Sequence, residues 1–345
     1  MSTEDPRTAR WRRRARRLTI GLGLAATAGG AALLLLELGV RLSGVQPDFF
    51  FQLDPEVGAI HIPGKRGWHT FAEGRQRIEI NRHGYRDREW RVDKPVDVRR
   101  IAVLGDSFVE GFQVPIDAHV LRRLEERLGD PCGDGKRLEL MNFGVSGFGT
   151  GQALETLRHR AAAFDLDAVL LFAYPSNDLF DNSREIDIEP NRLHFALGAD
   201  GALHRLPYRV ADHPVKRWLR HHSQAYLFVR DRLKRFGAIR RAMIAARWMQ
   251  EEKTRAERDA ARRDASSLLD ARYQVPPPPP IERAWVLTEA LVVAVRDSAE
   301  AQGAAFGVAH RDDERFGEHP RPLDRRRRRH LITGVEQTAR VAPRC

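Results

Sequence analysis

The stretch from Arg100 to Gly111 constrains the fold of this chain more than any other. Residues 100–104 form a short run of mostly branched apolar side chains, the pattern of a buried strand. Gly105, Asp106 and Ser107 interrupt that run at once. A serine directly after a central strand lies where open α/β sheets form their ligand crevice. Two interpretations follow: Ser107 is a nucleophile held at a tight turn, or Asp106 and Ser107 only cap the next helix.

Strand and helix patterns alternate on both sides of this point. Strands are expected at 100–104, 137–143, 167–174 and 304–310, and helices at 118–128, 152–163 and 281–303. Alternation on this scale predicts an α/β fold with a parallel sheet and helices on both faces. The carboxyl ends of parallel strands meet at one edge of the sheet, so residues that follow them come together there.

Each of the first three strand ends carries a group suited to acyl-transfer chemistry. Ser107 offers a hydroxyl, Gly147 a backbone N–H that no Cβ shields, and Asn177 a side-chain amide. A hydroxyl with several donors nearby is the arrangement that stabilises a tetrahedral oxyanion. The glycine-rich stretch 144–151 lacks both the Gly-Lys-Ser/Thr ending of a phosphate loop and the spacing of a dinucleotide loop. Ester chemistry is therefore favoured over nucleotide binding.

The chain resembles the SGNH (GDSL-type) hydrolase family in three ordered blocks, Gly105-Asp-Ser107, Asn142-x-Gly-x-Ser-Gly147 and Asn177-Asp178. The resemblance covers roughly residues 97–183, with a late helix and strand. It implies a flavodoxin-like three-layer α/β/α fold, Ser107 as nucleophile, and an oxyanion hole from the N–H groups of Ser107 and Gly147 and the Asn177 side chain. Members are esterases, lipases, carbohydrate deacetylases and some O-acetyltransferases. Pro175 replaces the glycine usual in the third block.

The general base is the part of the family pattern that this chain does not reproduce. The family supplies it from an Asp-x-x-His motif after the last core strand, and the motif occurs nowhere in this sequence. His310, His319 and His330 lie in that region. His330 is the candidate base, because the following Leu331-Ile-Thr-Gly334 resembles the family's histidine-containing loop. Residues 311–345 are rich in Arg, Pro and His. Two explanations are open: the end of the chain is truncated or frame-shifted, or the chain uses a divergent base.

The amino-terminal region predicts a membrane anchor. Five arginines within residues 12–17 directly precede residues 18–36, which carry no charge. A helix of that length, rising about 1.5 Å per residue, just crosses a hydrocarbon core of about 30 Å. The preceding arginines keep the N-terminus in the cytoplasm, so we expect a single-pass cell-membrane protein whose later residues are periplasmic. A cleaved signal peptide would have a shorter apolar region, and a buried helix would not abut such a cluster.

Charge and composition limit the partners. The chain has a formal net charge of +11, but the basic residues gather at its two ends and the body is nearly neutral, which argues against a nucleic-acid partner. The expected partners are an acyl-ester substrate and, through the anchor, the membrane. The two cysteines have no metal-ligand spacing, so neither cofactor nor metal is expected. Cys132 is expected to be a free loop thiol, and a single bridge between Cys132 and Cys345 is the alternative.

The domain organisation is expected to comprise six segments: a basic cytoplasmic N-terminus (1–17), a transmembrane anchor (18–40), a β-rich extension (43–99), the first part of the hydrolase core (100–183), a helical and polyproline insertion (184–280), and the last part of the core with a divergent tail (281–345). The insertion is either a cap over the substrate crevice or a surface excursion. The favoured function is an extracytoplasmic serine ester hydrolase acting on O-acyl esters of envelope glycans or lipids. An O-acetyltransferase on a glycan and a catalytically inactive binding domain are the alternatives.

Overall fold

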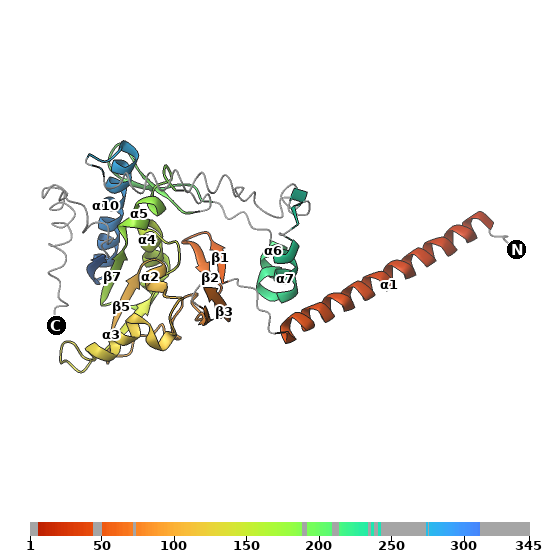
Figure 1. The fold of residues 1–345 in the computed structure, drawn as a ribbon, viewed down its shortest axis with the longest axis horizontal. Coiled ribbons are helices and arrows are strands. Elements are labelled where there is room, and N and C mark those ends of the chain that lie inside the picture. The colour runs from red at the N-terminus through yellow and green to blue at the C-terminus, as the bar shows by residue number, and fades with distance from the viewer. Residues whose placement is uncertain are drawn as a thin grey trace. The chain divides into compact units, whose positions relative to one another are not determined.

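The computed structural model describes residues 6–43, 50–71, 74–187, 192–208, 214–233 and 276–310, together with residues 236, 237, 241, 242 and 274. Contacts within the chain separate it into two compact units. The smaller unit combines residues 1–47 with 212–251, and the larger combines 48–211 with 252–345. Figure 1 colours the described helices and strands of both units in chain order.

A four-stranded parallel sheet forms the centre of the larger unit. Its strands lie in the order β10 (Ala305–His310), β7 (Ala168–Ala173), β5 (Val98–Leu104) and β6 (Arg137–Asn142). Each neighbouring pair is parallel. The chain passes from β5 to β6 on one side and then crosses to β7 on the other, which is the strand order of a flavodoxin-like sheet. The expected α/β fold with a parallel sheet is confirmed, and its topological switch point lies between β5 and β7.

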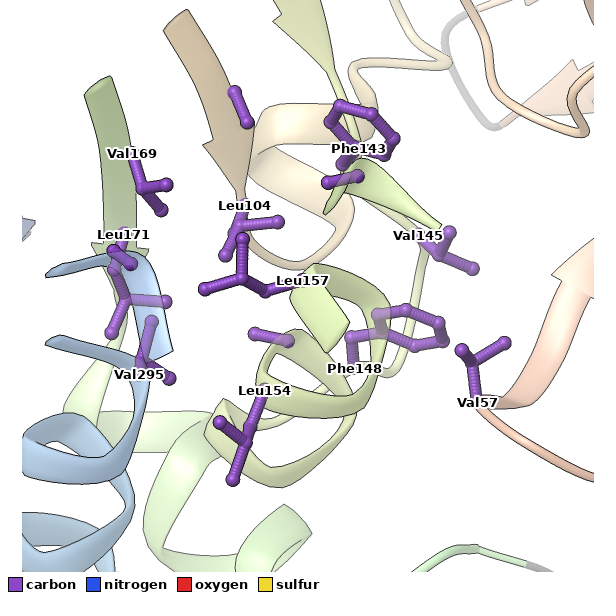
Figure 2. Close-up of a cluster of buried hydrophobic side chains, with 14 of the residues drawn as sticks. Val57, Leu104, Phe143, Val145, Phe148, Leu154, Leu157, Val169, Leu171 and Val295 are labelled. Atoms are coloured by element: carbon purple, nitrogen blue, oxygen red, sulfur yellow. The ribbon is translucent and has the colours of Figure 1, made fainter. Parts of the chain in front are cut away.

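One face of this sheet is covered by α4 (Thr150–His159) and α10 (Pro279–Glu300). Figure 2 shows side chains of this layer converging, among them Leu104, Val169 and Leu171 from the sheet, Leu154 and Leu157 from α4, and Val295 from α10. Strand side chains alternate between faces. Ala102 and Leu104 of β5 therefore join this cluster, while Val103 points to the opposite face.

The opposite face is covered by α2 (Ser107–Glu110) and α3 (Val120–Leu128). Val109 and Leu121 from these helices pack with Val103, Leu138 and Leu140 of the sheet. The imidazole of His119 caps α3 by accepting the N–H of Leu121. Helices on both faces of the sheet complete the three layers that the sequence pattern predicts.

Three antiparallel hairpins accompany the sheet in the larger unit. They pair β1 (Phe51–Asp54) with β2 (Gly58–His61), β3 (Arg66–Phe71) with β4 (Gly74–Glu79), and β8 (Phe195–Leu197) with β9 (Leu203–Arg205). The turn that follows β4 carries Tyr85 and Trp90, whose rings pack on Phe143 in the main core cluster. Residues ahead of β5 are thus part of the same hydrophobic core as the sheet.

The smaller unit consists of α1 (Pro6–Leu42), α6 (Pro214–His222) and α7 (Gln224–Leu233) in its described part. Within α1, the candidate span Arg16–Leu42 contains an 18-residue stretch whose mean hydropathy is 1.8 and of which no residue is buried. This helix is long and apolar enough to cross a membrane, a property it shares with signal sequences. In Figure 1, α6 and α7 lie beside its carboxyl-terminal end. The orientation across the membrane stays a prediction.

A further helix, α5 (Pro175–Asn182), follows β7, in a stretch to which the sequence analysis assigned no element. Its start is favoured by Pro175 in the first turn and by the carboxyl group of Asp178, whose Oδ2 accepts the N–H of Tyr174 at 2.9 Å. Cys132 is disulfide-bonded, so the expected free thiol is wrong. The six predicted domain boundaries stay predictions, as does any role for His319 and His330, which lie outside the described residues.

Candidate functional site

Ser107 is the first residue of α2 and directly follows the turn that ends β5. The carboxylate of Asp106 caps this short helix, because its Oδ1 accepts the N–H of Phe108 at 2.9 Å. Gly105 is required at the turn, since a Cβ there would lie 2.5 Å from Cγ2 of Val109. The hydroxyl of Ser107 is half-buried and has no hydrogen-bond partner within the described part of the chain. Asp106 is therefore a cap, and the adjacent hydroxyl is available for chemistry.

Asn177 is brought next to this turn from the end of β7. Its Nδ2 donates to Oδ2 of Asp106 at 2.8 Å, although 71 residues separate the two along the chain. The contact spans the switch point between β5 and β7, where flavodoxin-like sheets bind their ligands. Asn177 and the Ser107 turn, two of the regions singled out in the sequence, thus lie at one edge of the sheet.

The loop that follows β6 is packed against α2 by its backbone. The N–H of Val145 donates to the carbonyl of Gly105 at 3.2 Å. A Cβ on Gly144 would lie 2.5 Å from the backbone nitrogen of Glu110, so only glycine allows the two segments this close. Oδ1 of Asn142 accepts the N–H of Gly144 at 2.9 Å and fixes the start of the loop. The second sequence block is thereby held beside the first.

Glu110 is the side chain that holds this loop in place. Its carboxylate accepts the N–H of Ser146 at 2.9 Å and also the hydroxyl of the same residue. The third donor is Nε2 of His61, at 2.7 Å. His61 and Glu110 have 0% and 1% of their side-chain surface exposed. Nδ1 of His61 lies 3.0 Å from the carbonyl oxygen of Gly84, so both ring nitrogens of this buried imidazole have polar partners.

Gly147 adopts φ = +78°, a conformation that side chains disfavour. Neither its N–H nor the N–H of Ser107 donates a hydrogen bond to a described residue. Asn177 retains a second amide hydrogen beyond the one given to Asp106. Three donors are therefore left around the two adjoining turns, which is the kind of set that an oxyanion requires.

Two buried carboxyl groups lie beneath these turns. Burial raises the pKa of Asp178 to about 8, and the nearby charge of Asp106 adds to the effect. Burial likewise raises the pKa of Asp106, against hydrogen bonds from Phe108 and Asn177 that lower it. At neutral pH, Asp178 is therefore largely protonated, which avoids two adjacent buried anions.

Arg192 lies next to Gly147 and was not singled out in the sequence. A Cβ built on Gly147 would come 3.8 Å from Nη2 of Arg192. The guanidinium pairs with Asp181 through Nη1, and its Nε lies 3.5 Å from Asp187. Burial lowers the pKa of Arg192 to about 10, and the side chain stays a cation at neutral pH. No short motif marks this arginine, because its approach to the loop depends on tertiary contacts, among them those with Asp181 and Asp187.

The described histidines give no partner for Ser107. His119 faces the carbonyl of Val109, and His194 pairs with Asp187 at 2.7 Å. His310 ends β10 at the same sheet edge and is exposed. His330, the expected base, lies outside the described residues, so its role stays a prediction. Among the described residues, no group of three or more His, Cys, Asp or Glu side chains is arranged to hold a metal ion.

Comparison with known proteins gives only distant matches. No family model and no curated protein matches the chain. Among solved structures, AlinE4, described as an SGNH-hydrolase family esterase, is 23% identical over 25% of this chain and 44% of its own, with a TM-score of 0.22. TesA is 22% identical over 24% of this chain and 43% of its own, with a TM-score of 0.21. This chain thus spans less than half the length of these structures, and the proposals below rest on the residues described above.

Proposed function

We propose that the larger unit is a serine-dependent ester hydrolase of the SGNH type with Ser107 as nucleophile. The hydrogen bond between Asp106 and Asn177 carries this proposal, because it brings the ends of β5 and β7 together at the switch point. The N–H groups of Ser107 and Gly147 and the amide of Asn177 are the proposed oxyanion donors. Donors of this kind each contribute about 10²–10³-fold to the rate of acyl transfer.

The proposed reaction proceeds through an acyl-enzyme. Oγ of Ser107 attacks the ester carbonyl carbon while its proton passes to a base, for which His330 is our candidate. The tetrahedral intermediate collapses, and the alcohol leaves with a proton from that base. Water then attacks the acyl carbon, releases the acid and restores the serine hydroxyl.

The proposed substrate is an O-acyl ester of an envelope glycan or lipid, met outside the cytoplasm. The support is α1, whose apolar stretch follows a cluster of arginines and would leave the larger unit beyond the membrane. Arg192 beside Gly147 supplies a cationic group for an anionic part of such a substrate.

Hydrolysis of p-nitrophenyl acetate by the full chain in detergent tests this proposal. We expect turnover that Ser107→Ala reduces at least about 10³-fold, because the nucleophile is lost. Ser298→Ala on α10 is the matched control and should retain full activity. Turnover that is unchanged in Ser107→Ala would refute the assignment.

A catalytically inactive domain that binds a glycan is the second candidate. It is favoured by the missing Asp-x-x-His motif and by the engagement of His61, His119 and His194 in other contacts. A chain that binds acetylated glycan with no turnover in either the wild type or Ser107→Ala would support this candidate. Transfer of the acyl group to a sugar instead of water would point to an O-acetyltransferase.

A further inference from the structure

The last turn of α1 is joined to the junction between α6 and α7 by the carboxylate of Glu37. Its oxygens accept the hydroxyl of Ser223 at 2.8 Å and the N–H groups of Gln224 and Ala225, each at 3.0 Å. The three donors belong to the first turn of α7, so Glu37 caps that helix from outside. Arg41 adds a second link, since its Nη2 donates to the carbonyl of His222, the last residue of α6.

These contacts fix where α6 lies relative to the apolar part of α1. The stretch 18–36 is uncharged, and Glu37 and Arg41 are the first charged residues after it. In a membrane-spanning α1 they lie at the boundary between hydrocarbon and headgroups, where charged side chains are tolerated. Because α6 ends at the carbonyl that Arg41 holds, its carboxyl end lies at the same depth.

The exposed side of α6 has the composition of a membrane-interface helix. Val215, Trp218 and His222 are three and four residues apart and so share one side of the helix. Val215 is 54% exposed and Trp218 is 60% exposed. Residues 214–233 contain five Lys or Arg against a single Asp. An indole flanked by basic side chains is the combination that binds at the headgroup level of bilayers.

We propose that α6 binds anionic phospholipid headgroups beside the end of α1, with Trp218 inserted at the interface. The negative charge of the lipid phosphates complements the excess of basic residues in 214–233. The hydrogen bonds to Glu37 hold α6 close to these phosphates. Each basic side chain near such a surface strengthens binding about fivefold. α6 and α7 thereby form a second membrane contact in addition to the span.

The proposal is tested on the full chain reconstituted in two kinds of phosphatidylcholine vesicle, one without and one with about 30 mol% phosphatidylglycerol as the anionic lipid. Lipids brominated near the headgroup quench indoles at the interface. The difference in quenching between the wild type and Trp218→Phe separates the contribution of Trp218 from that of the other five tryptophans, and we call this difference the Trp218 share. We expect that share to rise at least about twofold with phosphatidylglycerol and to fall in high salt, since headgroup attraction is screened.

Two further variants control the experiment. Trp68→Phe removes an exposed indole of the larger unit and should leave the Trp218 share intact. Arg217→Glu reverses an exposed charge on α6 and should remove most of the response to phosphatidylglycerol while circular dichroism remains unchanged. A Trp218 share that is zero, or that is equal in both lipids and insensitive to salt, would overturn the proposal and indicate a neutral or protein partner.

Discussion

Asp178 and His119 are buried groups whose pKa values move in opposite directions. Burial raises the pKa of Asp178 from 3.8 to about 8, so the native state keeps a proton that the unfolded chain releases. The corresponding stability is complete below pH 3.8 and is lost as the pH rises to about 8. Burial, aided by Arg86, lowers the pKa of His119 from 6.5 to about 4, so its contribution is complete above pH 6.5 and is lost on acidification.

We predict that Asp178→Asn flattens the decline in stability between pH 6.5 and pH 8. Above pH 6.5 His119 is neutral in the native state and mostly neutral in the unfolded chain, so the wild type should lose stability mainly through Asp178, by up to about 1.4 kcal/mol per pH unit. Urea denaturation at several pH values measures the slope. His119→Gln is the control and should keep the wild-type slope there, whereas equal slopes in wild type and Asp178→Asn would contradict the prediction.

Asn177 carries a prediction about activity rather than stability. Asn177→Ala removes a proposed oxyanion donor and one hydrogen bond to Asp106, so kcat should fall about 10²–10³-fold while unfolding changes by about 1 kcal/mol. Steady-state kinetics and thermal unfolding give the two values. A rise in KM of about 10²–10³-fold with kcat unchanged would instead indicate that Asn177 binds the substrate.

The residues of the site differ in how far sequence could identify them. Ser107, Gly147 and Asn177 follow strands that the apolar pattern reveals, and parallel pairing brings strand ends to one edge. The bond between Asp106 and Asn177 and the approach of Arg192 to Gly147 depend on side-chain geometry across the fold. Local pattern carries no information on such contacts, and His330, the proposed base, lies in a stretch of the sequence with no long apolar face.

At the scale of elements, Glu110 connects three segments through one carboxylate. It joins α2 to β2 through His61 and to the loop after β6 through Ser146. His61 is fully buried, and both of its ring nitrogens have hydrogen-bond partners. Gly111 ends α2, because it adopts a left-handed conformation with φ = +65°.

We predict that Glu110→Ala destabilises the larger unit by about 3–5 kcal/mol, because it leaves the buried imidazole of His61 and the N–H of Ser146 without an acceptor. The double variant Glu110→Ala/His61→Ala should lose much less stability than the sum of the losses in the two single variants, because the two side chains share one contact. Urea denaturation measures all three variants.

The matched control is Glu126→Ala, which removes an exposed partner of Arg123 and should change stability by less than about 0.5 kcal/mol. A cost of Glu110→Ala no larger than that of Glu126→Ala would show that the carboxylate is dispensable for holding the loop.

At the scale of the whole molecule, we predict that α1 anchors the protein in a membrane. The unburied apolar stretch within the candidate span Arg16–Leu42 predicts stable membrane association of the full chain. The double variant Leu24→Asp/Ala28→Asp places two charges in the middle of the span. Each charge makes insertion into the membrane less favourable by about 2.5–3.5 kcal/mol. We predict that this variant is released by alkaline carbonate extraction, whereas the wild type stays in the membrane fraction.

A control for this prediction is Leu42→Asp, which adds a charge at the last residue of α1, beyond the uncharged stretch, and should leave extraction unchanged. Release of the wild type by carbonate would show that α1 does not span the bilayer. The sequence could predict this helix because its apolar length is a local property, whereas the capping of α7 by Glu37 joins residues almost two hundred positions apart.

Gly144 brings the two proposed catalytic turns into close backbone contact, since a Cβ there would lie 2.5 Å from the backbone nitrogen of Glu110, and Gly105 has no room for a methyl group beside Val109 and the carbonyl of Phe172. The turns behave as one rigid part, so neither can be remodelled alone to admit a different acyl chain. A library randomised at both positions should return glycine from any screen for soluble protein, before activity is ever selected. Changes in specificity are then open only to side chains that border this rigid part, such as Arg192.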